Sequence, residues 1–550
     1  MESKHETGRP TIMAPNAMVT SPHYLASQSG MSILKKGGNA IDAAIAIAST
    51  LAVVYPHMNG IGGDNFWLIH NGETKETHGL NASGRAVNHA TIDFYKKQGY
   101  KSIPARGYLS ANTVPGAVDG WGEAYHYASS SMSSSVQWHE LLADAISYAE
   151  GGFPVSPSQH HWTKVNVDKS DQEFRDLGRF KEFSKTFLSE EGLPYEPGDL
   201  FKQPDLAISM KEIAEKGSRA FYFGEIAEKI VNDGELNGGM ITAADLESHT
   251  STWVEPITTS YRGYTAYNLP PNTQGFASLS ILNILNNIAL SEVEEGSSLY
   301  YQYIIEATKA AFKDRDQWLT DPEFIDIPID KLLSQEHGKD LAEKILAKVP
   351  MEMSKPLDPK GDTVSFSVVD EDGNAVSVIQ SIYHDFGSGI IPSKTGIVLQ
   401  NRGSFFSLDE NHVNALAPRK RTFHTLNPAM LFHGTNPYLV YGTMGGEGQP
   451  QTQAALVTRV IDYGFSVQEA IEAPRWLYGR TWGAGSNTLK LEGRIPGEVM
   501  NDLRKVYGEI EKLGNWEDTM GHAGMILIDQ KSNVKHGGAD PRGDGLALGY

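Results

Sequence analysis

Cysteine is absent from the 550-residue sequence, and basic charge is scarce. Without cysteine, the chain has no disulfide framework, cysteine zinc site, iron–sulfur ligation or thiolate nucleophile, although the compartment stays undecided. The 47 Lys and Arg residues face 67 Asp and Glu residues, which gives a formal net charge of −20. Because an acidic surface repels phosphates, neither nucleic acid nor an anionic membrane is expected as a partner.

Long apolar runs are missing as well. The most apolar window, 40–55, includes Asp42 and breaks at Pro56, so it is shorter than the roughly 20 residues that span a bilayer. The segment 1–10 is polar and lacks the apolar centre of a secretory signal. We therefore expect a cytoplasmic protein that makes no membrane contact.

The composition that remains is globular, with 40% hydrophobic residues, 55 Gly and 27 Pro. Apolar residues at helical spacing before Gly37-Gly38 predict a helix over 24–36, and Asn39 suits the N-cap of a second helix over 40–55. The middle of the chain alternates helical stretches with polar loops and shows no catalytic signature. No spacing typical of metal ligands occurs, so neither a metal nor a cofactor is predicted.

A β-hairpin is predicted where the chain changes from helices to strands. Residues 363–369 alternate with a period of two, residues 375–381 are predicted as a second strand, and the five residues between them form a strong turn signal. That turn would set Thr363 directly across from Ser381, with Cβ atoms about 4.5–5.5 Å apart. The pattern by itself is typical of an ordinary cross-strand pair. The polar segment 351–361 before the hairpin reads as an exposed connector.

Several motifs in register resemble the gamma-glutamyltranspeptidase family. Its large-subunit landmarks are matched by residues 37–44, 56–63 and 114–116, and its small-subunit landmarks by 363–374, 386–389, 427–428 and 445–446. The resemblance implies an α+β fold, the four-layer αββα sandwich of the N-terminal nucleophile hydrolases. It also implies a precursor that cuts itself before the catalytic threonine.

The cleavage that this resemblance implies falls between Asp362 and Thr363. It would produce a large chain, 1–362, and a small chain, 363–550, which associate as one structural unit. The oligomeric state beyond this pair is left open.

The resemblance also implies the catalytic roles. Thr363 would be the nucleophile, with its own free α-amine as the base, because such an amine has a pKa of roughly 7.7–8.0. Ser381 would orient the Thr363 hydroxyl. Gly445 and Gly446 would present backbone N–H groups as an oxyanion hole. Attack on an amide carbonyl would then form an acyl-enzyme.

Most positions that bind the γ-glutamyl group in the family are changed here. The corresponding residues of this chain are Arg85, Tyr383, Arg402, Phe405, His424 and Thr425. Phe405 replaces the aspartate that pairs with the substrate ammonium, whereas Arg402 adds positive charge. The changes favour a small anionic acyl group without an α-amine.

Within the family, residues 81–85, 381–387 and 442–451 resemble the oxamate amidohydrolase-like members. Arg85, Arg402 and Tyr383 are the candidates for binding a small carboxylate, although either arginine could instead form a surface or structural ion pair. We therefore expect a self-cleaving amidohydrolase of a small anionic amide. One alternative is a gamma-glutamyltransferase or glutathione hydrolase, and another is a non-catalytic relative that never matures.

Overall fold

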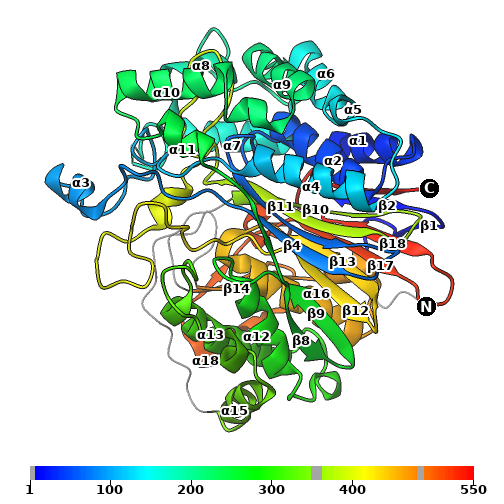
Figure 1. The fold of residues 1–550 in the computed structure, drawn as a ribbon. Coiled ribbons are helices and arrows are strands. Elements are labelled where there is room, and N and C mark those ends of the chain that lie inside the picture. Colours follow the sequence, from blue (N-terminus) through cyan, green and yellow to red (C-terminus); the bar gives the residue numbers. More distant parts are fainter. Residues whose placement is uncertain (1–6, 172, 349–361, 480–487) are drawn as a thin grey trace.

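Two seven-stranded antiparallel sheets lie face to face in the computed structural model, which describes residues 7–171, 173–348, 362–479 and 488–550 (Figure 1). The first sheet has the order β19-β2-β10-β11-β3-β4-β7, with β2 (Met18–Ser21), β3 (Asp64–His70), β4 (Thr77–Ala82), β7 (Thr252–Val254), β10 (Asp362–Val369), β11 (Ala375–Tyr383) and β19 (Leu546–Gly549). The second sheet has the order β1-β18-β17-β13-β12-β9-β8, with β1 (Ile12–Ala14), β8 (Ile257–Tyr261), β9 (Tyr264–Asn268), β12 (Ala429–His433), β13 (Asn436–Thr443), β17 (Ala523–Ile528) and β18 (Lys535–Ala539).

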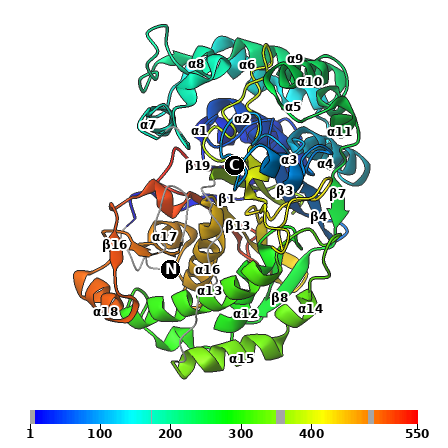
Figure 2. The ribbon, with the colours of Figure 1, turned by 90° about the vertical axis from the view of Figure 1, so that its left-hand side faces the viewer.

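Helices cover the outer face of each sheet (Figure 2). Those on the first sheet are α1 (Tyr24–Lys35), α2 (Ala40–Val54) and α4 (Ala117–Ser131). The second sheet carries α12 (Gly275–Leu285), α16 (Gln449–Ile461) and α17 (Val467–Glu472), with α13 (Ser298–Trp318) packed on α12 and α16. This layering confirms the expected α+β fold, a four-layer αββα sandwich.

Shorter elements surround the sandwich. The other α-helices of the described residues are α3 (Ile92–Lys97), α5 (Trp138–Leu141), α6 (Ala143–Gly151), α7 (Pro157–Asn166), α8 (Lys181–Phe187), α9 (Pro204–Lys216), α10 (Glu225–Asn237), α11 (Ala243–Glu247), α14 (Ile329–Leu332), α15 (Gln335–Leu346) and α18 (Gly497–Tyr507). Two small sheets are formed by β5 (Phe153–Pro154) with β6 (Leu200–Phe201), and by β14 (Trp476–Tyr478), β15 (Leu489–Leu491) and β16 (Ile510–Lys512).

The ends of α1 and α2 follow the sequence signals. Helix α1 ends before Gly37, whose φ of 88° only glycine adopts readily. Asn39 caps α2, and its side chain and that of Asp42 form a reciprocal capping box. Both predicted helices are therefore confirmed to within a residue or two.

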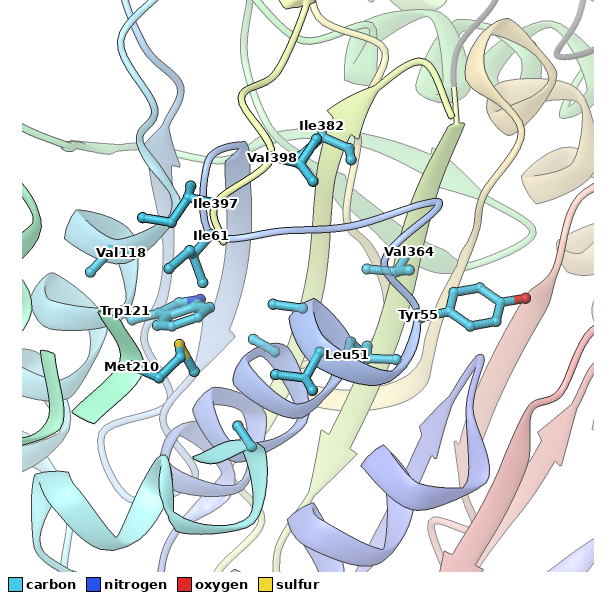
Figure 3. Packing of buried hydrophobic residues seen from close by; sticks show 14 of the residues in the cluster. Leu51, Tyr55, Ile61, Val118, Trp121, Met210, Val364, Ile382, Ile397 and Val398 are labelled. Carbon is cyan, nitrogen blue, oxygen red and sulfur yellow. The ribbon is translucent and has the colours of Figure 1, made fainter. Parts of the chain in front are cut away.

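Buried side chains on the two faces of the first sheet fix the direction of the predicted nucleophile. Phe66 and Ile379 face the second sheet and belong to the core between the sheets. Val364 of β10 lies on the opposite face, beside α2 (Figure 3). Because successive side chains of a strand alternate, Thr363 and Ser365 face the second sheet.

Among the helices of the described ranges, none combines the length and the apolar character that crossing a bilayer would take. The cytoplasmic location stays a prediction. The predicted connector, 351–361, lies outside the described residues.

Candidate active site

Thr363 lies at the start of β10 with its side chain fully buried. Ser377 of the neighbouring strand donates from Oγ to the carbonyl of Tyr441 in β13 at 3.4 Å. Nearer to Thr363, Ser365 lies against Gly442, where an added Cβ would come within 2.1 Å of the serine hydroxyl oxygen. Toward Thr363, the contact on β13 moves from Tyr441 to Gly442. Thr363 therefore points toward the turn that follows β13.

A β-bulge in β11 lies opposite Thr363. The pairing of β10 with β11 follows the predicted register from the turn up to the residue after Thr363. The register then shifts, because Asp362 pairs with Tyr383 rather than with the residue before it. Two residues of β11 therefore lie against Thr363 alone. The predicted direct opposition of Thr363 and Ser381 is wrong in this detail, since the bulge adds one residue to β11.

The bulge leads into an unusual backbone conformation at Tyr383. Its φ of 80° is left-handed, which is uncommon for a residue with a Cβ. The Tyr383 N–H turns back and donates to Ser381 Oγ at 2.8 Å. This bond occupies one acceptor position of the hydroxyl and so restricts its orientation beside Thr363.

Gly445 and Gly446 form the turn after β13, with φ values of 117° and 55°. The peptide group that carries the Gly445 N–H is held by Thr443, whose Oγ1 donates to the Met444 carbonyl at 2.9 Å. The peptide group that carries the Gly446 N–H is held by a bond from the Gly448 N–H to the Gly445 carbonyl at 2.8 Å. Both predicted oxyanion-hole donors therefore belong to peptide groups with fixed orientation.

Gln274 supports this turn, although no feature of the sequence pointed to it. Its Nε2 donates to the carbonyls of Gly446 (2.9 Å) and Thr425 (2.7 Å). Arg315 donates to Gln274 Oε1 at 3.2 Å and forms a buried ion pair with Glu447 at 2.6 Å. Two residues that precede Thr363 thus hold two loops that follow it.

Arg402 is a buried cation with unused donors. Its exposed fraction is 1%, and its Nη1 donates to Thr425 Oγ1 at 3.2 Å. The guanidinium carbon lies 4.1 Å from the centroid of the Tyr383 ring. Its Nε and Nη2 groups have no hydrogen-bond partner among the described residues. Burial lowers the pKa of Arg402 to about 10, so the side chain is still charged at neutral pH.

Asp64 connects the surroundings of Ser381 and Arg402. It lies opposite Ser381 in the pairing of β3 with β11, and it is fully buried. Its carboxylate accepts four hydrogen bonds of 2.9 to 3.2 Å, from the backbone N–H groups of Gly84 and Gly116 and from the side chains of Gln400 and His424. Burial raises the pKa of Asp64 to about 6, although the bonds from Gly84, Gly116 and Gln400 and the charge of Arg402 oppose the shift.

His424 is fixed as one neutral tautomer. Its Nδ1 accepts from the Leu426 N–H at 3.4 Å, so its Nε2 carries the proton and donates to Asp64 at 3.2 Å. Burial, reinforced by Arg402, lowers the pKa of His424 well below its usual value. Asp64 was missed by the sequence analysis, although an acidic residue directly after a glycine-rich loop was a usable signal.

Arg85 lies in a different environment. It forms ion pairs with Asp321 (3.4 Å) and Glu323 (2.5 Å), and it donates to the Arg419 carbonyl at 3.0 Å. These contacts border a polar surface pocket of ≈ 290 Å³ whose lining among the described residues does not include Arg402. The structure therefore brings together Tyr383, Arg402, His424 and Thr425. Arg85 is instead paired with Asp321 and Glu323.

The sequence model of the family described as Gamma-glutamyltranspeptidase matches residues 26–550. The chain belongs to this family. Two curated relatives span almost the same length. The glutathione hydrolase-like YwrD proenzyme of Bacillus subtilis is 47% identical and covers 98% of this chain and 99% of its own. The oxamate amidohydrolase proenzyme of Klebsiella pneumoniae is 43% identical with the same coverage.

A solved structure extends this agreement to the fold. The cephalosporin acylase from Bacillus halodurans superposes with a TM-score of 0.88 at 35% identity, covering 100% of this chain and 98% of that one. The family and its hydrolase relatives identify the chain as an enzyme that hydrolyses carbon–nitrogen amide bonds.

Proposed function

We propose that this family member is a self-cleaving threonine amidohydrolase that removes ammonia or an amine from a small anionic amide. The observation that carries the proposal is Arg402, a buried guanidinium with two N–H groups that no described residue binds. Such a group offers the paired donors that a carboxylate accepts. The 43% identity to an oxamate amidohydrolase proenzyme supports the same class of substrate.

Maturation and catalysis would use one hydroxyl. In the precursor, Thr363 Oγ1 attacks the Asp362 carbonyl, and hydrolysis of the resulting ester separates chains 1–362 and 363–550. The freed α-amine of Thr363 then takes the hydroxyl proton when that oxygen attacks the substrate amide. Protonation of the leaving nitrogen completes formation of the acyl-enzyme, and water releases the acid.

The neighbours of Thr363 would stabilise this reaction. Ser381 orients the threonine hydroxyl, and the N–H groups of Gly445 and Gly446 stabilise the oxyanion. Arg402 binds the substrate carboxylate through Nε and Nη2, with Tyr383 stacked on its guanidinium. His424 and Thr425 would complete the acyl pocket, with the Thr425 hydroxyl holding Arg402 Nη1.

Intact mass under denaturing conditions tests the nucleophile. We expect two fragments that meet at Thr363 in the wild-type protein and one uncut chain of 60.2 kDa in Thr363→Ala. A wild-type chain that stays uncut on prolonged incubation would instead support the alternative of a non-catalytic relative.

Glutathione hydrolase activity is the second candidate, favoured by the 47% identity to a glutathione hydrolase-like proenzyme. Phe405 argues against it, because a γ-glutamyl substrate needs an acidic partner for its ammonium group. We expect the matured enzyme to hydrolyse oxamate faster than glutathione or glutamine at equal concentration. Hydrolysis confined to γ-glutamyl compounds would reverse the choice.

A further inference from the structure

The charges around Arg402 are balanced before any anion binds. Arg402 and Asp64 carry opposite charges, influence each other's pKa and are both buried. His424, which donates to Asp64 and whose pKa Arg402 lowers, is neutral. Adding a carboxylate to Arg402 would leave one net negative charge in a site shielded from water. Such an excess charge is strongly disfavoured unless a proton or a counter-charge accompanies it.

Other charged groups near Asp64 do not supply the missing positive charge. Arg421 acts on Asp64, but Asp321 and Glu323 act on it as well, and its Nε and Nη2 already donate to the Ser83 carbonyl and the Thr252 hydroxyl. Tyr222 also feels Asp64, and its own hydroxyl stays protonated because burial and Asp119 raise its pKa.

One atom of the Asp64–His424 pair has room for a proton. Asp64 Oδ1 accepts three hydrogen bonds, whereas Oδ2 accepts only the bond from His424 among the described residues. On His424, Nε2 already carries a proton, and Nδ1 accepts the Leu426 N–H. Asp64 Oδ2 is therefore the atom that an added proton would reach at least cost.

We propose that a carboxylate held by Arg402 binds together with one proton, which Asp64 Oδ2 receives beside His424. Asp64 is thus a positioning residue whose protonation makes the pocket selective for anionic over neutral acyl groups. The inference rests on the anionic substrate proposed above. A pKa of about 6 in the free enzyme leaves Asp64 mostly ionised at pH 7, and a second negative charge beside it raises that pKa further.

The pH dependence of KM tests the proposal in the wild-type enzyme. Because the proton joins with the substrate, KM for oxamate should be level below about pH 6 and should rise about tenfold per pH unit above it. Oxamide, in which a neutral amide replaces the carboxylate, should show no such rise. Any effect of the Thr363 α-amine is common to both substrates. Equal pH profiles for the two would overturn the proposal.

Asp64→Asn and Asp370→Asn form a matched pair of variants. Asparagine at position 64 removes the charge, as protonation does, but its Nδ2 cannot accept the bond from His424. We therefore expect KM for oxamate to lose its rise with pH up to pH 8, whereas a purely structural role would raise KM and keep the rise. Asp370 is also buried and has a pKa raised to about 6 by burial, but it lies in the turn at the far end of the β10–β11 hairpin. Asp370→Asn should therefore keep the wild-type pH dependence of KM for oxamate. Loss of that dependence in Asp370→Asn would contradict the assignment of the proton to Asp64.

Calorimetry with pyruvate, a carboxylate with a single negative charge and no amide, separates this inference from the proposed function. At pH 7, in two buffers of different ionisation enthalpy, we expect uptake of most of one proton per pyruvate in the wild type and none in Asp64→Asn. Oxamate hydrolysis without proton uptake would overturn the inference and leave the function standing. Proton uptake with pyruvate in an enzyme that leaves oxamate intact would support the inference and overturn the function, and failure of pyruvate to bind would overturn the inference.

Discussion

Arg402 and Arg85 carry the same charge but differ in what surrounds it. Arg85 already has two carboxylate partners, whereas Arg402 has a hydroxyl, an aromatic ring and two donors that no described residue accepts. The sequence motifs pointed to both arginines and could not choose between them, because the choice depends on which acidic side chains fold against each. For Arg85, those acidic side chains are Asp321 and Glu323.

Substitution by lysine should separate the two arginines. Lysine keeps the charge but loses the paired donors, which costs about 1.5–3 kcal/mol for a hydrogen bond to a charged group. We expect Arg402→Lys to raise KM for oxamate about 10- to 100-fold, and Arg85→Lys to change it less than twofold. Steady-state kinetics of the matured variants provide the measurement. The reverse ranking would assign the carboxylate to Arg85.

Within the hairpin β10–β11, the alternation of residues and the turn predicted the pairing well. The bulge could not be predicted, because nothing in the local sequence marks the extra residue, and Tyr383 is an unusual choice for a left-handed conformation. The sequence also contained no sign that Gln274 holds the Gly445–Gly446 turn. Gln274 lies more than 150 residues away along the chain, and only the packing of α12 against the second sheet brings it there.

Gln274→Ala tests that support. Without its amide, the carbonyls of Gly446 and Thr425 lose a buried donor. We expect kcat to fall about 10- to 100-fold because the Gly445–Gly446 turn, the proposed oxyanion hole, loosens. An accompanying loss of stability of about 1–3 kcal/mol is expected from the unsatisfied carbonyls.

Gln203→Ala is the matched control for this variant. Gln203 is also buried, and its Nε2 donates to the Val53 carbonyl at 2.8 Å, away from the turn. We expect Gln203→Ala to lose a similar free energy of unfolding, measured by thermal unfolding, and to keep the wild-type kcat. Equal kcat values in the two variants would show that Gln274 acts through stability alone.

At the scale of the whole molecule, strands from the two sides of residue 363 interleave. In the first sheet, β2 lies between β19 and β10, and β3 pairs with β11. In the second sheet, β1 pairs with β18 and β9 pairs with β12. The four layers followed from the resemblance to a family rather than from the hydrophobic pattern, since no local pattern records which strands become neighbours across several hundred residues.

This interleaving predicts that the two fragments of the proposed cleavage stay together. Separating them would break strand pairings in both sheets and expose the core between them. We expect co-elution in size-exclusion chromatography after long dilution, and separation only when denaturant unfolds both fragments in one transition. Dissociation under native conditions would contradict the prediction.

Strand β2 has a consequence for how the enzyme is made. Both of its neighbours in the sheet lie on the other side of residue 363, so a fragment 1–362 synthesised alone would hold β2 with neither edge paired. In the uncut chain, β10 and β19 are covalently linked to β2, so their effective concentration near it is high. We therefore expect the proposed cleavage, and with it the N-terminal amine of Thr363, only in molecules whose two sheets are already assembled. Misfolded copies would then stay uncut and lack the reactive terminus.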